Sequence, residues 1–272
     1  MRRFTFSKGH GTRNDFVIID DQHGMQPLDP DFVVAICDRH SGIGADGVLR
    51  VVRSQHVPEW TGAKDLWFMD YRNADGSIAE MCGNGLRVFA RHLVNEQWVP
   101  SGDFTVATRA GLRRVMVARG GLITTGLGAV TVSDDPVEVT HLGRRWPATA
   151  VDVGNPHAVV FVDDDMRSGL DLTRAPGWEP AERFPHGTNV EFVSVRGPGL
   201  LDMRVFERGS GETQSCGTGV VAAAAAHRAA TGHDGSVEVH VPGGELTVEF
   251  HDDEAWLTGP AVVFARGEFW SP

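Results

Sequence analysis

The sequence is poor in lysine, in long apolar runs and in net positive charge. Lys8 and Lys64 are the two lysines among 25 basic residues, and neither lies in a phosphate-binding context, which argues against a pyridoxal-phosphate enzyme with a Schiff-base lysine. The net charge of −11 argues against a nucleic-acid partner, because phosphate binding needs clustered positive charge. The longest apolar run, residues 220–226, is far shorter than the roughly 20 residues of a membrane helix, and no apolar segment follows the N-terminal arginines. We therefore expect neither a membrane span nor a signal peptide.

Cysteine is also scarce. Cys37, Cys82 and Cys216 are too few and too widely spaced for a disulfide framework, and their reduced thiols indicate a cytoplasmic protein. No Cys-x-x-Cys pair occurs, and none of the 12 histidines has a zinc-ligand spacing, so we expect no metal.

Strand-like segments dominate the chain, and three helical patterns interrupt them. We expect helices at about 29–39, at 86–94, and from Gly217 to about Thr231, where Gly232 takes the position favoured at a helix C-cap. The predicted strands cover residues 3–7, 15–20, 47–52, 66–72, 104–108, 112–119, 122–125, 129–132, 149–153, 158–162, 189–195, 201–206, 236–240, 245–250 and 261–265.

Two Cys-Gly-x-Gly turns divide the chain into similar halves. Cys82-Gly83-Asn84-Gly85 and Cys216-Gly217-Thr218-Gly219 lie 134 positions apart, close to half of 272 residues, and each precedes a helical pattern. This spacing is typical of an internal duplication, so we predict two pseudo-symmetric domains. Gly120-Gly121 is the expected boundary, with residues 1–120 in the first half and 121–262 in the second.

The places of Cys82 and Cys216 predict a chemical role. A buried cysteine is ordinarily a small hydrophobic residue, and we interpret Cys37 in this way. Cys82 and Cys216 both stand where the chain enters a helix. The partial positive charge of a helix N-terminus can lower the pKa of a thiol from about 8.5 to roughly 3.5–7.5, and its exposed N–H groups attract a carboxylate.

Two such sites gripping one carboxylate would place a sulfur on each face of the adjacent α-carbon. One thiolate could then remove the α-proton while the opposite thiol delivers another, which inverts the centre without a cofactor. A thiol hydrolase needs one nucleophile with a histidine base, which leaves the second cysteine idle. A disulfide oxidoreductase normally uses Cys-x-x-Cys.

A glycine pattern at residues 42–47 is interpreted as a turn. Gly42-Ile43-Gly44-Ala45-Asp46-Gly47 matches the dinucleotide-binding sequence G-x-G-x-x-G, which should follow a strand and open a helix. Here the pattern follows a helix-like stretch and precedes a strand-like one. The reversed order argues against a nucleotide site.

Several motifs together resemble the diaminopimelate epimerase family. They are Lys8-Gly9-His10-Gly11-Thr12-Arg13-Asn14-Asp15-Phe16, Asn73-Ala74-Asp75-Gly76-Ser77, Met81-Cys82-Gly83-Asn84-Gly85, Gly154-Asn155-Pro156-His157, Gly187-Thr188-Asn189-Val190, and Glu207-Arg208-Gly209-Ser210-Gly211-Glu212-Thr213 followed by Cys216-Gly217-Thr218-Gly219. The resemblance implies an α/β (α+β) fold of two pseudo-symmetric domains, each a mixed, largely antiparallel sheet wrapped around a central helix. In that fold the C-terminal strand 263–272 would join the N-terminal half. It also implies a cofactor-independent epimerase and a homodimer, acting on LL- and meso-diaminopimelate in lysine and peptidoglycan precursor synthesis.

The resemblance also implies roles for individual residues. Cys82 and Cys216 would be the acid/base pair, and His157 and Glu207 would orient the substrate's ammonium group or tune the thiols. The residues expected to bind substrate are Asn14, Asn73, Gly83, Asn84, Asn155, Asn189, Glu207, Arg208, Gly217 and Thr218. Asparagine carboxamides and one fixed cation suit a substrate with zwitterionic ends. Asparagines beside glycine or proline are also common turn residues, and Glu207 with Arg208 could form a surface ion pair.

Two departures from the family pattern concern the N-terminal half. Many members carry Gln at Gly47 and Leu-Gly at Thr12-Arg13, so one hydrogen bond to the substrate is expected to be missing or replaced. Two alternatives stay open. A proline or hydroxyproline racemase also uses two cysteines but resembles Cys-Gly-His at the first site, and an amino-acid-binding protein would not require two thiols.

Overall fold

The computed structural model describes residues 2–26, 28–252 and 254–271. Met1 and Pro272, which the predicted N-terminal half includes, lie outside the described residues. The chain forms two compact units: the first runs to Thr125 and resumes at Gly259, and the second is Gly126–Thr258. The chain leaves the first unit within strand β7 (Ile123–Ala129) and returns to it at the end of β17 (Glu254–Gly259).

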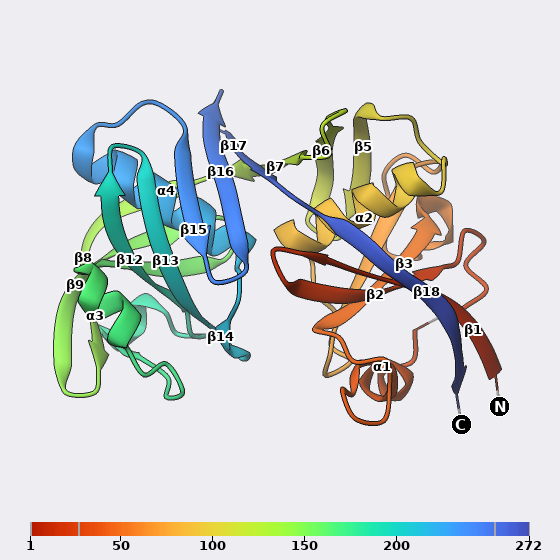
Figure 1. Cartoon of the computed structure of the whole chain (residues 1–272), viewed down its shortest axis with the longest axis horizontal. Helices are drawn as coiled ribbons and strands as arrows, with labels where there is room; N and C mark the ends of the chain where they lie inside the picture. The colour runs from red at the N-terminus through yellow and green to blue at the C-terminus, as the bar shows by residue number, and fades with distance from the viewer. Residues whose placement is uncertain (1, 27, 253, 272) are drawn as a thin grey trace. The chain divides into compact units, whose positions relative to one another are not determined.

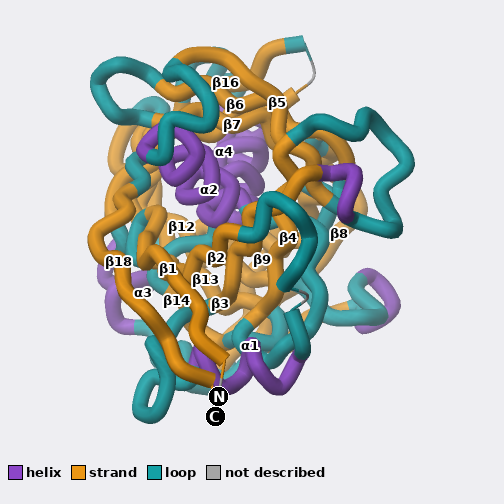
Figure 2. The backbone as a smooth tube through the Cα atoms, turned by 90° about the vertical axis from the view of Figure 1, so that its right-hand side faces the viewer, coloured by secondary structure: helices purple, strands orange, loops and turns teal. Residues whose placement is uncertain are grey.

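The first unit is a curved sheet with the strand order β18–β1–β2–β3–β4–β5–β6–β7. Its neighbouring strands are antiparallel except for two parallel pairs, β2–β3 and β4–β5. Besides the start of β7, the strands are β1 (Arg2–Gly11), β2 (Asn14–Asp20), β3 (Gly47–Arg53), β4 (Trp67–Asn73), β5 (Gly102–Thr108), β6 (Gly111–Val117) and β18 (Val262–Ser271). β1 and β18 lie side by side and lead to the two ends of the chain (Figures 1 and 2).

The strands of this unit curve around helix α2 (Gly83–Asn95), as Figure 1 shows. Leu86, Phe89 and Leu93 are fully buried on this helix and pack in one core with Phe16. This spacing of three and four residues is the one that predicted the helix. The shorter helices α1 (Pro30–Cys37) and η1 (Ser54–His56) lie outside this core cluster.

The second unit has the strand order β8–β9–β10–β12–β13–β15–β16–β17. Neighbours are antiparallel except for the parallel pairs β10–β12 and β13–β15. Besides the end of β7 and β17, the strands are β8 (Thr131–His141), β9 (Arg144–Asp152), β10 (Pro156–Phe161), β11 (Gly177–Glu179), β12 (Asn189–Gly197), β13 (Leu200–Glu207), β14 (Gly211–Thr213), β15 (Val237–Val241) and β16 (Gly244–His251). The central helix is α4 (Gly217–Thr231), whose run of buried alanines lets it lie close to the surrounding strands, and Gly232 ends it in the left-handed conformation.

The two units repeat one plan. The first unit runs from β18 to β7 and the second from β8 to β17, each through seven strand pairings. In both units the third and fifth pairings are parallel and the other five are antiparallel. In the first parallel pair of each unit, Phe16 lies opposite Gly47, and His157 lies opposite Asn189. Two residues on, Ile18 is opposite Leu49 and Val159 is opposite Glu191, so Leu49 and Glu191 hold equivalent positions. The predicted fold of two pseudo-symmetric sheets around central helices is confirmed.

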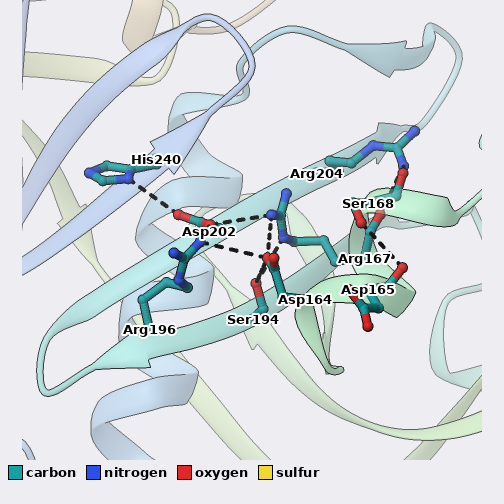
Figure 3. A network of polar contacts seen from close by, with 9 residues as sticks. All are labelled: Asp164, Asp165, Arg167, Ser168, Ser194, Arg196, Asp202, Arg204 and His240. Carbon is teal, nitrogen blue, oxygen red and sulfur yellow. Dashed lines mark hydrogen bonds and ion pairs between the residues drawn. The ribbon is translucent and has the colours of Figure 1, made fainter.

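The second unit also contains a short helix that the sequence pattern did not indicate, α3 (Asp164–Gly169). It buries no residue, so it has no apolar stripe to detect. A polar network fixes it to the sheet: Arg167 donates to Ser194 of β12 at 2.8 Å and to Asp202 of β13 at 3.2 Å (Figure 3). Across the described residues, no helix is both long and apolar enough to span a membrane.

Candidate functional site

Cys82 caps the N-terminus of α2. Its backbone is extended (φ −142°, ψ 122°), and its Sγ accepts a hydrogen bond from the N–H of Gly85 at 3.4 Å. Gly85 leaves little room around this turn, because a Cβ atom there would lie 3.3 Å from Leu49 Cδ2 and 3.4 Å from Phe16 Cζ. The sulfur therefore stands at the positive end of the helix, above an apolar floor.

Asn14 lies beside this thiol. Its Oδ1 accepts a hydrogen bond from the Cys82 thiol at 3.7 Å and another from Nδ2 of Asn84 at 3.3 Å. Its Nδ2 donates to Oδ2 of Asp46 at 2.8 Å, and Arg39 holds the other oxygen of Asp46 at 2.8 Å. Asp46 thus fixes which end of the Asn14 amide faces the sulfur.

A buried cation lies inside the first turns of α2. Arg87 is fully buried and donates to Oδ1 of Asn84 at 2.7 Å and to the carbonyl of Gly83 at 3.3 Å. Burial lowers the pKa of Arg87 to about 10, while the negative charge of the Cys82 thiolate acts to raise it. Arg87 was not a predicted site residue, because an arginine within a helical pattern is ordinarily exposed to solvent.

Cys216 caps the N-terminus of α4 with the same extended backbone (φ −120°, ψ 112°). Its Sγ lies 3.5 Å from Oγ1 of Thr218, and its side chain is buried. Burial, with the negative charges of Glu207 and Glu191, raises the pKa of the Cys216 thiol well above its ordinary value. The surroundings of Cys216 therefore favour the protonated thiol.

Glu207 stands at the end of β13, next to Cys216. Its carboxylate accepts a close hydrogen bond from the hydroxyl of Thr213 on β14. Burial raises the pKa of Glu207, although hydrogen bonds from Thr213 and Cys216 act to lower it. The β13–β14 hairpin, which is formed by the Glu207-to-Thr213 motif, brings these groups together.

His157 lies at the start of β10, and Asn155 directly precedes this strand. Nδ1 of His157 is 2.7 Å from Oε1 of Glu191, and Nε2 is 3.1 Å from Oδ1 of Asn155. Nδ2 of Asn155 donates to Oγ1 of Thr218 at 3.4 Å. A hydrogen-bonded chain thus runs from Glu191 to the residue beside Cys216. Glu191 was not a predicted site residue, although a single acid in the apolar stretch Val190-Glu191-Phe192 was a signal of it.

Asn189 and Arg208 lie beside one another in the second unit. Oδ1 of Asn189 accepts from the backbone N–H of Arg208 at 2.9 Å, and Nδ2 of Asn189 donates to the carbonyl of Pro156 at 3.4 Å. Arg208 is exposed and reaches the carbonyl of His186. Gly187 has a φ of +83°, and a Cβ atom there would be 2.9 Å from Cδ of Arg208, which explains the glycine.

Asn73, at the end of β4, is held in a local turn. Its Nδ2 donates to Oγ of Ser77 at 2.9 Å, and its backbone N–H donates to the Ser77 carbonyl at 3.0 Å. In the first unit, the predicted site residues around Cys82 are Asn14, Gly83 and Asn84. In the second unit, those around Cys216 are Asn155, His157, Asn189, Glu207, Arg208, Gly217 and Thr218. Asn73 neighbours the Cys82 group of the first unit through Ala74, whose N–H donates to the carbonyl of Asp46 at 3.2 Å.

The backbone at Gly47 leaves no room for the glutamine side chain that the family resemblance implies at this position. A Cβ atom would lie 2.5 Å from the carbonyl oxygen of Arg72 and 2.7 Å from Cε2 of Tyr71. The Tyr71 ring therefore occupies the space beside this position. Residues 42–46 form a loop between α1 and β3, and Gly47 begins β3, in agreement with the turn predicted from the reversed order of the glycine pattern.

One group of potential metal ligands occurs among the described residues. Glu238, His240 and Glu245 bring one ligand atom each within 4.8 Å of one another on β15 and β16. Nδ1 of His240 is 3.2 Å from Asp202, as Figure 3 shows, and Nε2 is 2.7 Å from Glu238. Both ring nitrogens of His240 are therefore already engaged by carboxyl groups of the protein.

The sequence matches known proteins along nearly its whole length. A family model described as diaminopimelate epimerase matches residues 6–132 and 149–267. A diaminopimelate epimerase of Streptomyces coelicolor is 52% identical, over 98% of this chain and 96% of that one. Those of Thermobifida fusca and Corynebacterium glutamicum are 48% and 47% identical, each over 97% of both chains.

Solved structures share the fold at low sequence identity. A PhzF-family phenazine biosynthesis protein of Bacillus anthracis is 16% identical with a TM-score of 0.69, over 100% of both chains. A hydroxyproline epimerase of Agrobacterium vitis is 15% identical with a TM-score of 0.71, over 98% of this chain and 92% of that one. These likenesses establish the architecture alone.

Proposed function

Because the chain belongs to the diaminopimelate epimerase family, we propose that it interconverts LL- and meso-diaminopimelate without a cofactor, in lysine and peptidoglycan precursor synthesis. Cys82 and Cys216 are the two acid/base groups. The observation that carries this proposal is the repeated site: each unit places one cysteine at the N-cap of its central helix. An asparagine contacts the start of each helix, Asn14 at Cys82 and Asn155 at Thr218.

The reaction conserves atoms and charge. One thiolate takes the α-hydrogen as a proton and becomes a thiol, and the electron pair of the broken C–H bond stays on the α-carbon next to the carboxylate. The opposite thiol then delivers its proton to the other face and becomes a thiolate. The product has the inverted configuration, and the two cysteines have exchanged protonation states. Exchange with water returns them to the starting form.

The helix N-termini bind the carboxylate of the reacting centre in this proposal. Gly83 and Asn84 open α2, and Gly217 and Thr218 open α4. The first N–H groups of a helix have no partner within it and attract anions. Such donors also stabilise the negative charge that develops when the proton leaves.

The remaining groups bind the distal amino-acid end of the substrate or orient its reacting end. Arg208 is exposed and supplies a fixed cation for a carboxylate. Asn14, Asn73, Asn155 and Asn189 supply amides that can donate and accept hydrogen bonds. His157 and Glu207 orient the ammonium group and tune the thiols, which agrees with the hydrogen bond between Cys216 and Glu207.

The test is proton exchange in heavy water. The enzyme should introduce deuterium at one α-carbon of LL-diaminopimelate as the meso isomer forms, with no added cofactor. Under the same conditions L-proline should not exchange. Rapid uptake into proline and none into diaminopimelate would instead identify a racemase of small cyclic amino acids.

We also infer that the protein is a cytoplasmic homodimer. The side chains of Val262 and Phe264 are exposed at the start of β18 and offer an apolar surface for a second copy to cover. Sedimentation equilibrium measures the mass in solution, and a single species of monomer mass at micromolar concentration would reject the dimer. Cell fractionation tests the compartment.

A further inference from the structure

The proposed reaction leaves one buried carboxylate without a role. Glu191 lies on β12 between Val190 and Phe192 and has no exposed surface. Its Oε1 is 2.7 Å from Nδ1 of His157, which is equally buried. Its Oε2 has no hydrogen-bond partner within the described part of the chain. Two ionisable groups removed from water are costly to a fold, so their retention needs a reason.

The fold itself does not require this pair. The equivalent positions of the first unit hold Phe16 in place of His157 and Leu49 in place of Glu191. Both apolar residues are fully buried and pack against the first turn of α2 near Gly85. The same architecture is therefore filled by hydrocarbon in one unit and by an acid and a base in the other.

The hydrogen bonds around His157 fix the orientation of its ring. Nδ1 faces the carboxyl group of Glu191, and Nε2 faces the amide oxygen of Asn155, so each ring nitrogen has an oxygen partner. The Asn155 amide is oriented independently, because its Nδ2 donates to Thr218. A His157 ring that donates from both nitrogens is compatible with all three contacts.

The carboxylate also lies against the helix that carries the thiol. A Cβ atom on Gly219 would be 2.7 Å from Oε1 of Glu191 and 3.4 Å from Sγ of Cys216. Glycine at this position therefore lets the acid and the sulfur share the first turn of α4. The negative charge of Glu191 is one of the causes that raise the pKa of Cys216.

We propose that Glu191 is a positioning residue for the C-terminal half of the reaction. It holds His157 doubly protonated, and through the chain His157–Asn155–Thr218 it fixes the groups beside Cys216 and keeps that thiol protonated between turnovers. Glu191 touches no substrate in this scheme. The inference rests on the proposed epimerisation, but its structural part can be tested without substrate.

The test is Glu191→Gln, which keeps the shape of the side chain and removes its charge. In the unliganded wild-type protein, nitrogen NMR should show both ring nitrogens of His157 protonated at neutral pH, and in the variant one of them should lose its proton. With Cys37 and Cys82 replaced by alanine, the thiolate absorbance of Cys216 should appear at lower pH after the change. The proposal would be overturned if Glu191→Gln changed neither the nitrogen NMR signals of His157 nor the pH at which the Cys216 thiolate absorbs.

The second test of the role of Glu191 is the turnover rate. Glu191→Gln should lower kcat by about 10–100-fold, the usual range for a residue that orients a functional group, with a smaller change in KM. In a His157→Gln background the same change should have little further effect, whereas independent, additive losses would contradict action through His157. If the wild-type protein does not epimerise diaminopimelate but the NMR signals of the His157 ring nitrogens behave as expected, the proposed function is wrong. The inferred role of Glu191 in holding His157 is then still supported.

The matched control is Asp20→Asn. Asp20 makes the same 2.7 Å contact to a buried histidine, His92 of α2, away from both thiols. It should lower stability and leave kcat unchanged. If Glu191→Gln does not fold, Glu191→Leu copies the Leu49 of the first unit and should fold with kcat reduced to the same extent. Wild-type turnover in that variant would reject the role.

Discussion

Asn14 and Asn155 hold the same position in the two units, two residues before Phe16 and His157 in the first parallel strand pair, but their amides are turned differently. Oδ1 of Asn14 faces the Cys82 thiol, while Nδ2 of Asn155 faces Thr218, the neighbour of Cys216. The two copies of the site share a backbone and differ in their polar contacts. Cys82 has an amide oxygen and a buried arginine nearby, whereas Cys216 has two carboxylates.

Replacing either proposed acid/base group should abolish epimerisation. Cys82→Ala and Cys216→Ala should each lower kcat by at least 10²–10⁴-fold, the range that general acid/base groups contribute. Circular dichroism and thermal unfolding should show an intact fold. Cys37→Ala is the matched control, because Cys37 is buried in a separate cluster and should leave turnover unchanged. Unchanged turnover in either of the first two variants would refute the two-thiol mechanism.

Releasing the amide of Asn14 should slow the reaction. Asp46→Asn removes the carboxylate that holds Nδ2 of Asn14 at 2.8 Å, so the amide can rotate and its oxygen no longer stays on Cys82. We expect kcat to fall by about 10-fold, as for other residues that orient a functional group. Asp38→Asn is the control, since Asp38 caps the same loop through Ser41 and His40. Equal losses in both variants would show a general effect of the loop.

Introducing at residue 47 the glutamine expected from the resemblance should destabilise the protein. In Gly47→Gln the new Cβ atom would lie 2.5 Å from a backbone oxygen, which cannot move aside cheaply. Overpacking of this kind costs about 1–3 kcal/mol. Thermal unfolding measures the loss against Gly120→Gln, where nothing lies within 4 Å of the added atom. If the Gly47→Gln protein were as stable as the Gly120→Gln protein, this explanation would be contradicted.

Stability should decline in alkaline solution because of Cys37. Burial raises the pKa of the Cys37 thiol from 9.0 to about 11. Below pH 9 the thiol is protonated in both folded and unfolded states and stability is unaffected. From pH 9 to 11 only the unfolded state releases the proton, so the free energy of unfolding falls as pH rises. Cys37→Ala should flatten this part of the profile in denaturant titrations, and an unchanged slope would disprove the assignment.

Much of the fold and the two thiol sites could be predicted because they leave local signals. Glycines follow each cysteine, apolar residues recur with helical spacing, and Gly232 marks the end of α4. The short helix α3 has no buried face, so no periodicity revealed it. Arg87 was missed for a different reason: its burial depends on partners such as Thr12, 75 positions away in the sequence.

The difference between the two units could not be predicted from motifs alone. Phe16 and Leu49 belong to ordinary strand patterns, and Glu191 is a single acid within another. Their equivalence emerges only from strand register, which pairs residues across the sheet. The sequence suggested two matched halves, and the side chains under the helices distinguish them.

The pairing of β18 with β1 has a consequence for biosynthesis. The second unit is one continuous segment, so all of it is synthesised before β18. Until β18 has been synthesised, the first unit lacks this edge strand, and β1 presents an open row of backbone donors and acceptors. The half of the chain made first is therefore the half completed last, and nascent chains stalled before residue 262 should expose β1 to chaperones and proteases.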